Sequence, residues 1–265
     1  MSGAPVRIVP IPGSRRAFRL VERNLLVTRR AWWVFCSGFL EPVLFLGSIG
    51  IGVGGLVGAV MVAGTAVPYS VFVAPGLLAT AAMNGAVLDA TFGFFIKFKY
   101  QHVYDAVTAT PMEPVDVARG EITWALMTGT VYSGAFLLTM VLFGDVRSPW
   151  AVLALPAAML LAVAFAAVGL AATTYMRSFI DFDFVQLATI PMFLFSGVFF
   201  PLSRYPDGLE LLVRCTPLVQ GVELVRAATL GRWSWAVPVQ VAYLVVMALV
   251  GVRVAGRRLR VLLGP

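Results

Sequence analysis

The stretch WAVLALPAAMLLAVAFAAVGLAATTYM, residues 150–176, contains no charged side chain. The hydrocarbon core of a bilayer is about 30 Å thick, and a helix needs roughly 20 apolar residues to cross it. The stretch is longer than that, so it predicts a membrane-spanning helix. The whole chain agrees: 60% of its 265 residues are hydrophobic and 12% are charged, whereas soluble domains carry about 25% charged residues.

Five further windows on either side of this stretch are apolar enough to cross a membrane. Together they predict an all-α integral membrane protein with six transmembrane helices. The predicted spans cover residues 32–56, 68–96, 122–143, 150–176, 184–202 and 235–254. We therefore expect two regions, a cytoplasmic arm at 1–31 and a single six-helix transmembrane domain at 32–265.

The placement of lysine and arginine predicts the orientation of these spans. An even number of spans puts both termini on one side. That side also receives the loop after the second span and Arg177, and holds fifteen of the twenty basic residues. Basic residues concentrate on cytoplasmic loops, so both termini are expected to be cytoplasmic, in a multi-pass protein of the plasma membrane. The net charge of +7 is then explained by topology and lipid headgroups rather than by nucleic acid.

The arm contains the stretch SRRAFRLVERNLLVTRR, residues 14–30. It places Phe18, Val21 and Leu25 on one helical face with arginines around the rest, which is typical of an amphipathic helix lying in the headgroup plane. Its start also resembles a twin-arginine export signal. Such a signal needs an apolar core, and here charged residues from Glu22 onward interrupt the sequence.

A polar stretch, KFKYQHVYDAVTATPMEPVDVARGE at residues 97–121, separates the second and third predicted spans. Residues 100–109 can form a helix. Thr110-Pro111 then ends it, because the residue before a proline disfavours the helical conformation. The sequence thus predicts a short polar helix on the cytoplasmic side.

On the opposite side, residues 201–233 are too polar to span and too apolar for a solvated loop. We expect two short helices here. Asp207 and Glu210 match a capping box at the start of the first, Thr216-Pro217 begins the second, and Gly231 ends it. Such a hairpin can shape an exit or can be a packed loop, and the sequence leaves both open.

Several short motifs in the sequence are better explained by structure than by nucleotide, metal or catalytic chemistry. The match to G-x-G-x-x-G at residues 50–55 lies in an apolar span, where glycines allow close helix packing. The chain has no G-x-x-x-x-G-K-[ST] motif, so no P-loop for ATP is present, and no catalytic motif supports an enzyme. His102 is the only histidine, without metal-ligand spacing around it. Cys36 and Cys215 imply no disulfide or metal framework.

Acidic residues lie in or near the spans at four positions of interest. Glu41 and Asp89 fall within the first and second spans, where ionisable groups are functional candidates but can also form hydrogen bonds between helices. Asp181 and Asp183 lie in RSFIDFDF, residues 177–184. They can cap the fifth helix or contact a cytoplasmic partner.

Four stretches resemble a known family: FLEPVLFL (39–46), YDAVTATPMEPVDVARGEI (104–122), SFIDFDFVQLATIPMFLFSGVFFPLSRYP (178–206) and TPLVQGVELVRAATLG (216–231). With the six spans, the interfacial entry helix and the outer helical hairpin, they resemble the permeases of type-2 ABC exporters, also called ABC-2 permeases. Within these the sequence is similar to the nodulation protein J-like and drug-exporter branch. The resemblance covers nearly the whole chain after the arm.

The resemblance implies a permease subunit that exports an amphipathic or lipid-linked cargo, either a lipo-oligosaccharide or glycolipid or a hydrophobic drug, as in multidrug efflux. It also implies two copies of a separate ATPase subunit that binds ATP and Mg²⁺, and a second permease copy, usually identical. This chain would bind no cofactor. The polar helix then becomes the coupling helix that contacts the ATPase. The residues expected at that contact are Tyr100, His102, Tyr104, Asp105, Thr108, Thr110, Pro111, Asp181 and Asp183.

The cargo path is expected along spans one, two and five. An aromatic stripe on a membrane helix is also explained by packing or lipid contact, and Gly197 can let the fifth helix break. The candidate residues are Glu41, Asn84, Asp89, Phe193, Phe195, Gly197, Phe199 and Phe200. A competing interpretation is an ATP-independent secondary transporter or an accessory membrane protein. A secondary transporter predicts an internal repeat, and the sequence contains no convincing one.

Overall fold

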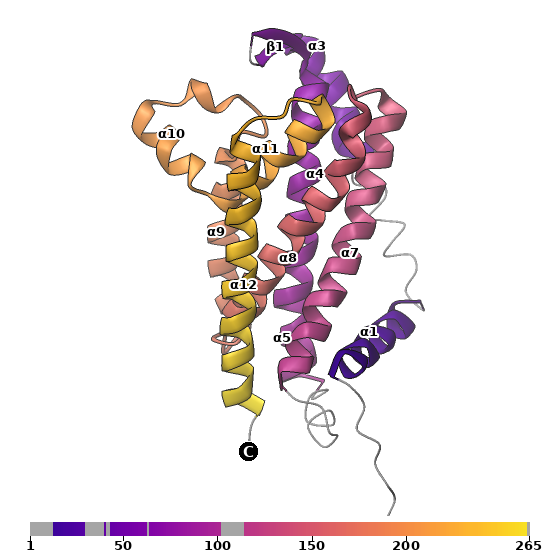
Figure 1. The fold of residues 1–265 in the computed structure, drawn as a ribbon, viewed down its shortest axis with the longest axis vertical. Coiled ribbons are helices and arrows are strands. Elements are labelled where there is room, and N and C mark those ends of the chain that lie inside the picture. The colour runs from indigo at the N-terminus through magenta and orange to yellow at the C-terminus, as the bar shows by residue number, and fades with distance from the viewer. Residues whose placement is uncertain (1–12, 30–39, 41–42, 63, 102–113, 264–265) are drawn as a thin grey trace, which may run out of the picture.

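The computed structural model describes residues 13–29, 40, 43–62, 64–101 and 114–263. Four described helices are long and apolar enough to cross a membrane, and they run beside one another in a bundle (Figure 1). They cover Tyr69–Lys99, Val115–Phe143, Pro149–Thr173 and Ala236–Leu262. These helices correspond to the second, third, fourth and sixth predicted spans.

The second spanning helix consists of three segments without a break. They are α4 (Tyr69–Leu88), the π-helical turn η2 (Asp89–Gly93) and α5 (Phe94–Lys99). The third is α7 (Pro114–Phe143), which begins eight residues before the predicted span. The fourth joins the 3₁₀ turn η3 (Pro149–Leu153) to α8 (Ala154–Thr173), and the sixth is α12 (Ala236–Leu263).

The other two predicted spans are not among these four. The first lies partly outside the described residues. Its described part is an apolar helix over Val43–Val57 that contains the π turn η1 (Ser48–Val53) and α3 (Gly54–Val57). The fifth is α9 (Phe182–Phe195), whose 14 residues extend about 21 Å at 1.5 Å per residue. Because a bilayer core is about 30 Å thick, α9 is shorter than a full crossing, and the six-span layout stays a prediction.

A small β-hairpin departs from the expected all-α architecture. Strands β1 (Ala59–Val62) and β2 (Thr65–Pro68) pair antiparallel directly before α4, where the sequence predicted no strand. Gly58 and Gly64 flank β1 with φ of 72° and 79°, a conformation that glycine adopts without steric cost. The apolar residues 56–68 are compatible with short strands as well as with the end of a helix. The turns at Gly58 and Gly64 favour the strands, because they let the chain reverse direction.

The predicted outer helical hairpin is present as the 3₁₀ turn η5 (Leu202–Arg204), α10 (Asp207–Arg214) and α11 (Pro217–Leu230). Thr216 and Pro217 begin α11 and Gly231 ends it with φ of 69°, as predicted. The predicted capping box is wrong. The cap of α10 is Pro206, and the Glu210 carboxylate pairs instead with Arg214 at 2.6 Å, one turn further along.

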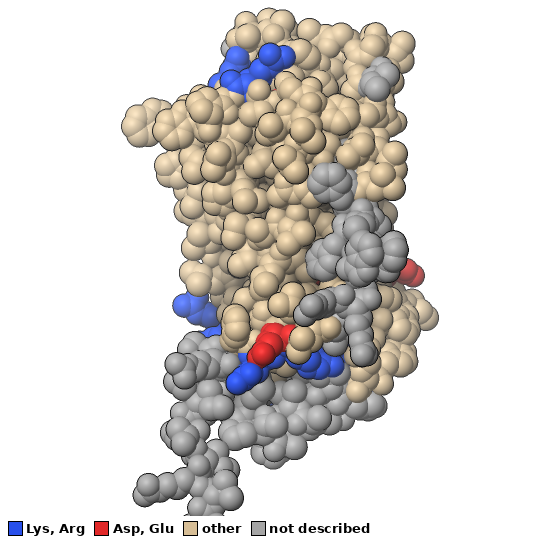
Figure 2. Space-filling view, turned by 90° about the vertical axis from the view of Figure 1, so that its right-hand side faces the viewer, with Lys and Arg blue, Asp and Glu red and all other residues tan. Residues whose placement is uncertain are grey.

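The bundle has two distinct ends. The hairpin end carries β1, β2, α10 and α11, and the basal end carries the N-terminal helix α1 (Gly13–Arg29), the end of α5 and the end of α12 (Figure 1). On the face in Figure 2, the described charged side chains gather toward these ends, with a broad uncharged band between them. The basal end is the one predicted to be cytoplasmic.

Helix α1 lies against the basal part of α7 (Figure 1). Leu20, Val21 and Asn24 are buried in this contact, whereas Phe18 and Leu25 are exposed. The predicted helix is therefore present, but its apolar residues divide between two directions. Val21 packs against the protein, and the exposed Phe18 and Leu25 are available to lipid, as an interfacial helix requires.

The core of the bundle is built around α8, which packs on α12, α7, α4 and α11. Its buried face is rich in alanine, so the backbones of its neighbours come close. A Cβ atom added to Gly251 of α12 would lie 2.8 Å from the carbonyl carbon of Ala167 and from the nitrogen of Val168 in α8. In a bilayer, helices associate through this kind of close packing rather than through the hydrophobic effect.

Gly251→Ala is therefore expected to lower the unfolding free energy by about 1–3 kcal/mol, the usual cost of overpacking. The added methyl group meets backbone atoms that cannot turn away. Unfolding of the purified chain in mixed micelles measures this. Gly134→Ala in α7 is the control, since its added Cβ meets nothing within 4 Å and alanine favours the helix. Equal stability of the two variants would contradict close packing at Gly251.

Candidate functional site

Most residues of the predicted coupling helix lie outside the described residues. These are His102, Tyr104, Asp105, Thr108, Thr110 and Pro111, and Glu41 of the predicted cargo path lies outside as well. Their proposed roles stay predictions. The described residues that flank this segment are Tyr100, exposed at the end of α5, and Pro114 at the start of α7.

Tyr100 belongs to an aromatic cluster that joins two basal segments. The Tyr100 ring stacks on Phe179 at 5.1 Å, and Phe95 contacts Phe179 at 5.4 Å and Phe182 at 5.1 Å, both edge to face. Phe92 completes the cluster. Each such pair contributes about 0.5–1.5 kcal/mol beyond its buried area. The end of α5, which leads into the predicted coupling helix, is thereby fixed to the segment that leads into α9.

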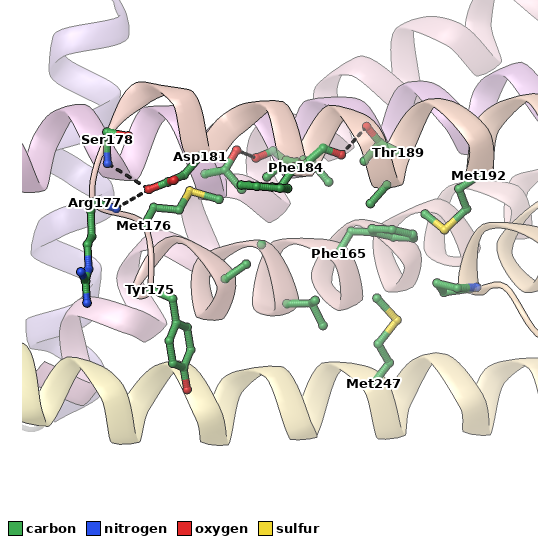
Figure 3. A pocket seen from close by; sticks show the side chains of 18 residues that line it. Phe165, Tyr175, Met176, Arg177, Ser178, Asp181, Phe184, Thr189, Met192 and Met247 are labelled. Atoms are coloured by element: carbon green, nitrogen blue, oxygen red, sulfur yellow. Dashed lines mark hydrogen bonds between the residues drawn. The ribbon is translucent and has the colours of Figure 1, made fainter.

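That second segment is the basal turn, residues 177–181, between α8 and α9. It contains the 3₁₀ turn η4 (Phe179–Asp181). The Asp181 carboxylate accepts hydrogen bonds from the backbone N–H groups of Arg177 (2.6 Å) and Ser178 (3.0 Å), visible as dashed lines in Figure 3. These bonds favour the ionised carboxylate and hold the pKa of Asp181 below its ordinary value. Asp181 thus caps the basal turn, while Asp183 is exposed beyond it.

A lowered pKa in the folded state links stability to pH. The contribution of Asp181 is fully present above the ordinary aspartate pKa and is lost as the pH falls through the lowered, folded-state value. We expect Asp181→Asn to remove this part of the pH dependence. Melting temperatures from about pH 6 down to about pH 3 test this, with Asp183→Asn as the charge-matched control. Identical pH dependence of the two variants would rule out this role for Asp181.

A buried ion pair and a hydrogen bond connect α5, α7 and α1 at the basal end. The Lys97 ammonium of α5 lies 2.7 Å from the Glu121 carboxylate of α7, and Asn24 of α1 donates to the other oxygen of that carboxylate at 3.4 Å. The Glu121 side chain is 2% exposed and that of Lys97 is 18% exposed. Because α5 and α7 flank the predicted coupling helix in the sequence, this pair fixes the described segments on either side of it to one another.

Lys97→Met is expected to lower the unfolding free energy by about 3 kcal/mol, because it removes one partner of a buried pair and leaves the carboxylate without that cation. Replacing both residues by methionine is expected to cost less than the single change. Chemical unfolding of the wild type, Lys97→Met, Glu121→Met and the double variant gives the coupling energy.

Arg19→Met serves as the reference for this experiment. Arg19 pairs with Glu22 on the exposed side of α1 at a similar distance, 2.8 Å, and exposed pairs contribute about 1 kcal/mol or less. If Lys97→Met were as mild as Arg19→Met, the basal pair would not constrain α5 and α7.

Among the described residues, those of the predicted cargo path lie at several separate places in the fold. Asp89, at the start of η2, accepts a hydrogen bond from Thr128 of α7 and so joins two helices. Phe193 packs edge to face on Phe199 at 5.2 Å. Phe195 and Phe200 each contact Tyr205, and the Gly197 carbonyl accepts a hydrogen bond from Arg226 of α11. Asn84 lines a groove between α4 and α9.

A large apolar groove, here called the basal groove, runs along one side of α9. Its volume is about 940 Å³. Its walls come mainly from α8, α9 and the turn between them, with one residue each from α4, η2, α11 and α12. Met192 and Met247 enter it from α9 and α12, with Phe165 of α8 between them, and Arg177 and Asp181 lie toward its basal end (Figure 3). Flexible methionine side chains adapt to irregular apolar partners, so the groove suits a hydrocarbon chain.

A second groove of about 490 Å³ lies between α9 and α4 with η2. It adjoins the basal groove, with which it shares the lining residues Val87, Thr91, Val185 and Thr189. Asn84 and Asp183 line it together with Phe179 and Phe182 of the aromatic cluster. None of the residues of α9 is buried. Helix α9 thus lines two adjoining grooves. It is held by the basal turn at one end and by the Gly197–Arg226 contact at the other.

These features were compared with known proteins. The family model described as "ABC-2 type transporter" matches residues 15–230. The chain belongs to this family. It is 30% identical to nodulation protein J of Sinorhizobium fredii (strain NBRC 101917 / NGR234) over 229 residues, 86% of each chain. It is 29% identical to nodulation protein J of Rhizobium leguminosarum bv. viciae over 244 residues, 90% of this chain and 93% of the relative.

The resemblance read from the sequence is therefore confirmed at the level of the family. An ABC-2 type chain is a transmembrane component of a transporter, and the four long apolar helices fit a multi-pass membrane protein. Sequence reasoning missed the aromatic cluster of this ABC-2 chain and the Lys97–Glu121 pair. The phenylalanines of RSFIDFDF were a signal for the cluster, but their partners in α5 lie more than 80 residues earlier.

Proposed function

We propose that this chain is the permease subunit of an ATP-driven exporter. Two copies of a separate ATPase subunit bind ATP and Mg²⁺ at the basal, cytoplasmic end, and two permease copies form the pathway. The cargo is amphipathic or lipid-linked, with glycolipids and hydrophobic drugs as the two candidate classes. Membership in the ABC-2 family supports the ATPase partner, and this chain itself carries no catalytic site in the proposal.

The aromatic cluster carries the proposal. It fixes the end of α5, next to the predicted coupling helix, to the basal turn that leads into α9. A rigid displacement of the coupling helix by the ATPase is then passed to α9 through packed rings. Since α9 forms a wall of both grooves, its displacement changes the space available to an apolar cargo. This is a two-state switch in which ligand at one site biases a distant element.

The basal groove supports an amphipathic cargo. Its lining is mostly apolar along α8, α9 and α12, whereas its basal end presents Arg177 and Asp181 (Figure 3). A cargo with a hydrocarbon tail and a polar end fits both parts. A secondary transporter needs ionisable groups that bind its coupling ion, and the groove offers few of them. The lining therefore favours an exporter that is driven by ATP hydrolysis in a partner subunit.

Phe179→Ala is expected to uncouple the transporter. The chain with its ATPase partner, reconstituted in vesicles, should keep assembly and basal ATP hydrolysis. Cargo-stimulated hydrolysis and export should fall about fivefold or more, the scale of a typical coupling energy. Ile180→Ala is the matched control, because Ile180 neighbours Phe179 in the basal turn and is 73% exposed.

Two outcomes would contradict the proposal. If Phe179→Ala exported as well as Ile180→Ala, the aromatic cluster would not couple the two segments. If the wild-type chain transported cargo without any ATPase, driven by an ion gradient alone, the proposal of an ATP-driven exporter would be wrong. The chain would then be a secondary transporter.

A further inference from the structure

A polar cavity, here called the hairpin pocket, lies beside the helical hairpin, at the end of the bundle opposite the basal groove. Its volume is about 590 Å³, and it opens between α11, the start of α12 and strand β1. Arg226 and Glu223 of α11, Arg232 after α11 and Gln240 of α12 line it, beside apolar side chains such as Leu230 and Val237. It shares no lining residue with either groove beside α9.

Two buried polar side chains in this pocket have an atom without a partner in the described chain. Arg226 is 6% exposed. Its terminal nitrogens bond Glu223 and the carbonyl groups of Gly197 and Phe72, but its Nε has no acceptor. Gln240 is 9% exposed, and its Oε1 has no donor. Unpaired buried groups each cost about 1–3 kcal/mol, and the two side chains that carry this donor and this acceptor line the same cavity.

The charges of the pocket favour an anion beside a hydrogen-bond donor. Three arginines and one glutamate line it. Arg214 pairs with Glu210, and Arg226 pairs with Glu223. Arg232 donates to the carbonyl of Val62 and forms no ion pair within the described residues. An anionic group can therefore bind between Arg226 and Arg232, while Gln240 and Glu223 offer acceptors nearby.

The surroundings place the pocket at the level of lipid headgroups. Trp150 and Trp233 contact edge to face at 6.3 Å, and Trp235 is 96% exposed. Tryptophans concentrate at the boundary between bilayer and water. Helix α10 next to the pocket exposes Leu211 and Leu212 on its amphipathic surface, as helices at that boundary do.

We propose that the hairpin pocket binds the headgroup of a phospholipid whose phosphodiester is followed by a donor group, such as phosphatidylethanolamine. The phosphate lies between Arg226 and Arg232, because guanidinium groups recognise phosphate through charge-assisted hydrogen bonds. The amine lies toward Gln240 and Glu223, and the glycerol backbone follows the apolar wall at Val237. This site is separate from the proposed export path and does not depend on it.

The test uses the full chain, purified and stripped of lipid, titrated with short-chain phosphatidylethanolamine. Native mass spectrometry counts bound lipid, and the melting temperature reports stabilisation by the ligand. We expect one tightly held lipid per chain at this site. Arg232→Gln is expected to weaken its affinity about tenfold, as loss of a hydrogen bond to a charged group does. Gln240→Leu should also weaken it.

Arg204→Gln is the matched control. It removes a cation from the same end of the protein, at an exposed position that does not line the pocket, and it should bind lipid like the wild type. If Arg232→Gln fails to fold, Gln240→Leu carries the comparison alone, because it removes no charge and replaces the amide with an apolar side chain of similar size.

Three results would overturn the proposal. Equal affinity of Gln240→Leu and Arg204→Gln would show that the pocket's polar atoms do not touch the lipid. Equal binding of a diacylglycerol with the same chains would show that no headgroup is recognised. Displacement of the lipid by inorganic phosphate at the same concentration would make the pocket a site for free anions rather than for a phospholipid.

Discussion

Close packing around a single alanine-rich helix is the interaction on which the rest of the structure depends. Inside a bilayer, lipid chains are as apolar as leucine, so helices gain little by leaving lipid and must gain from close contact. Helix α8 provides that contact on several sides. Glycines of its neighbours approach it closely: an added Cβ at Gly221 of α11 would lie 2.6 Å from Leu161, and one at Gly251 of α12 would lie 2.8 Å from Ala167.

Helix α9 follows the opposite pattern, and this contrast separates the rigid from the movable part of the molecule. Its sequence, FDFVQLATIPMFLF, is rich in long side chains and contains no glycine. It therefore cannot approach α8 as α12 does, and two adjoining grooves remain beside it. A helix with few buried contacts opens at low free energy. In the proposed exporter, the bundle around α8 is the frame against which α9 is displaced.

The apolar runs predicted the long helices because length and hydrophobicity alone determine whether a helix can cross a bilayer. The family could also be predicted from the sequence, because the motifs that indicate it lie in continuous stretches. The β-hairpin was missed because its apolar strands resemble a helix end, and only the backbone at Gly58 and Gly64 distinguishes them. The aromatic cluster and the hairpin pocket were missed for another reason. Phe95 meets Phe179, and Arg226 meets Phe72, across more than 80 residues, and no local pattern encodes such pairs.

The two tethers of α9 determine how it can move. At its basal end, Asp181 holds the turn through two backbone hydrogen bonds, and Phe179 ties that turn to α5. At its far end, the helix stops at Phe195, and the Gly197 carbonyl is held 2.8 Å from Arg226. In the proposed exporter, a displacement at the aromatic cluster moves the basal end of α9 relative to its far end, which Arg226 holds. Because the two grooves share lining residues of α9, this movement alters both of them together, and Arg226 links the far end of α9 to the hairpin pocket.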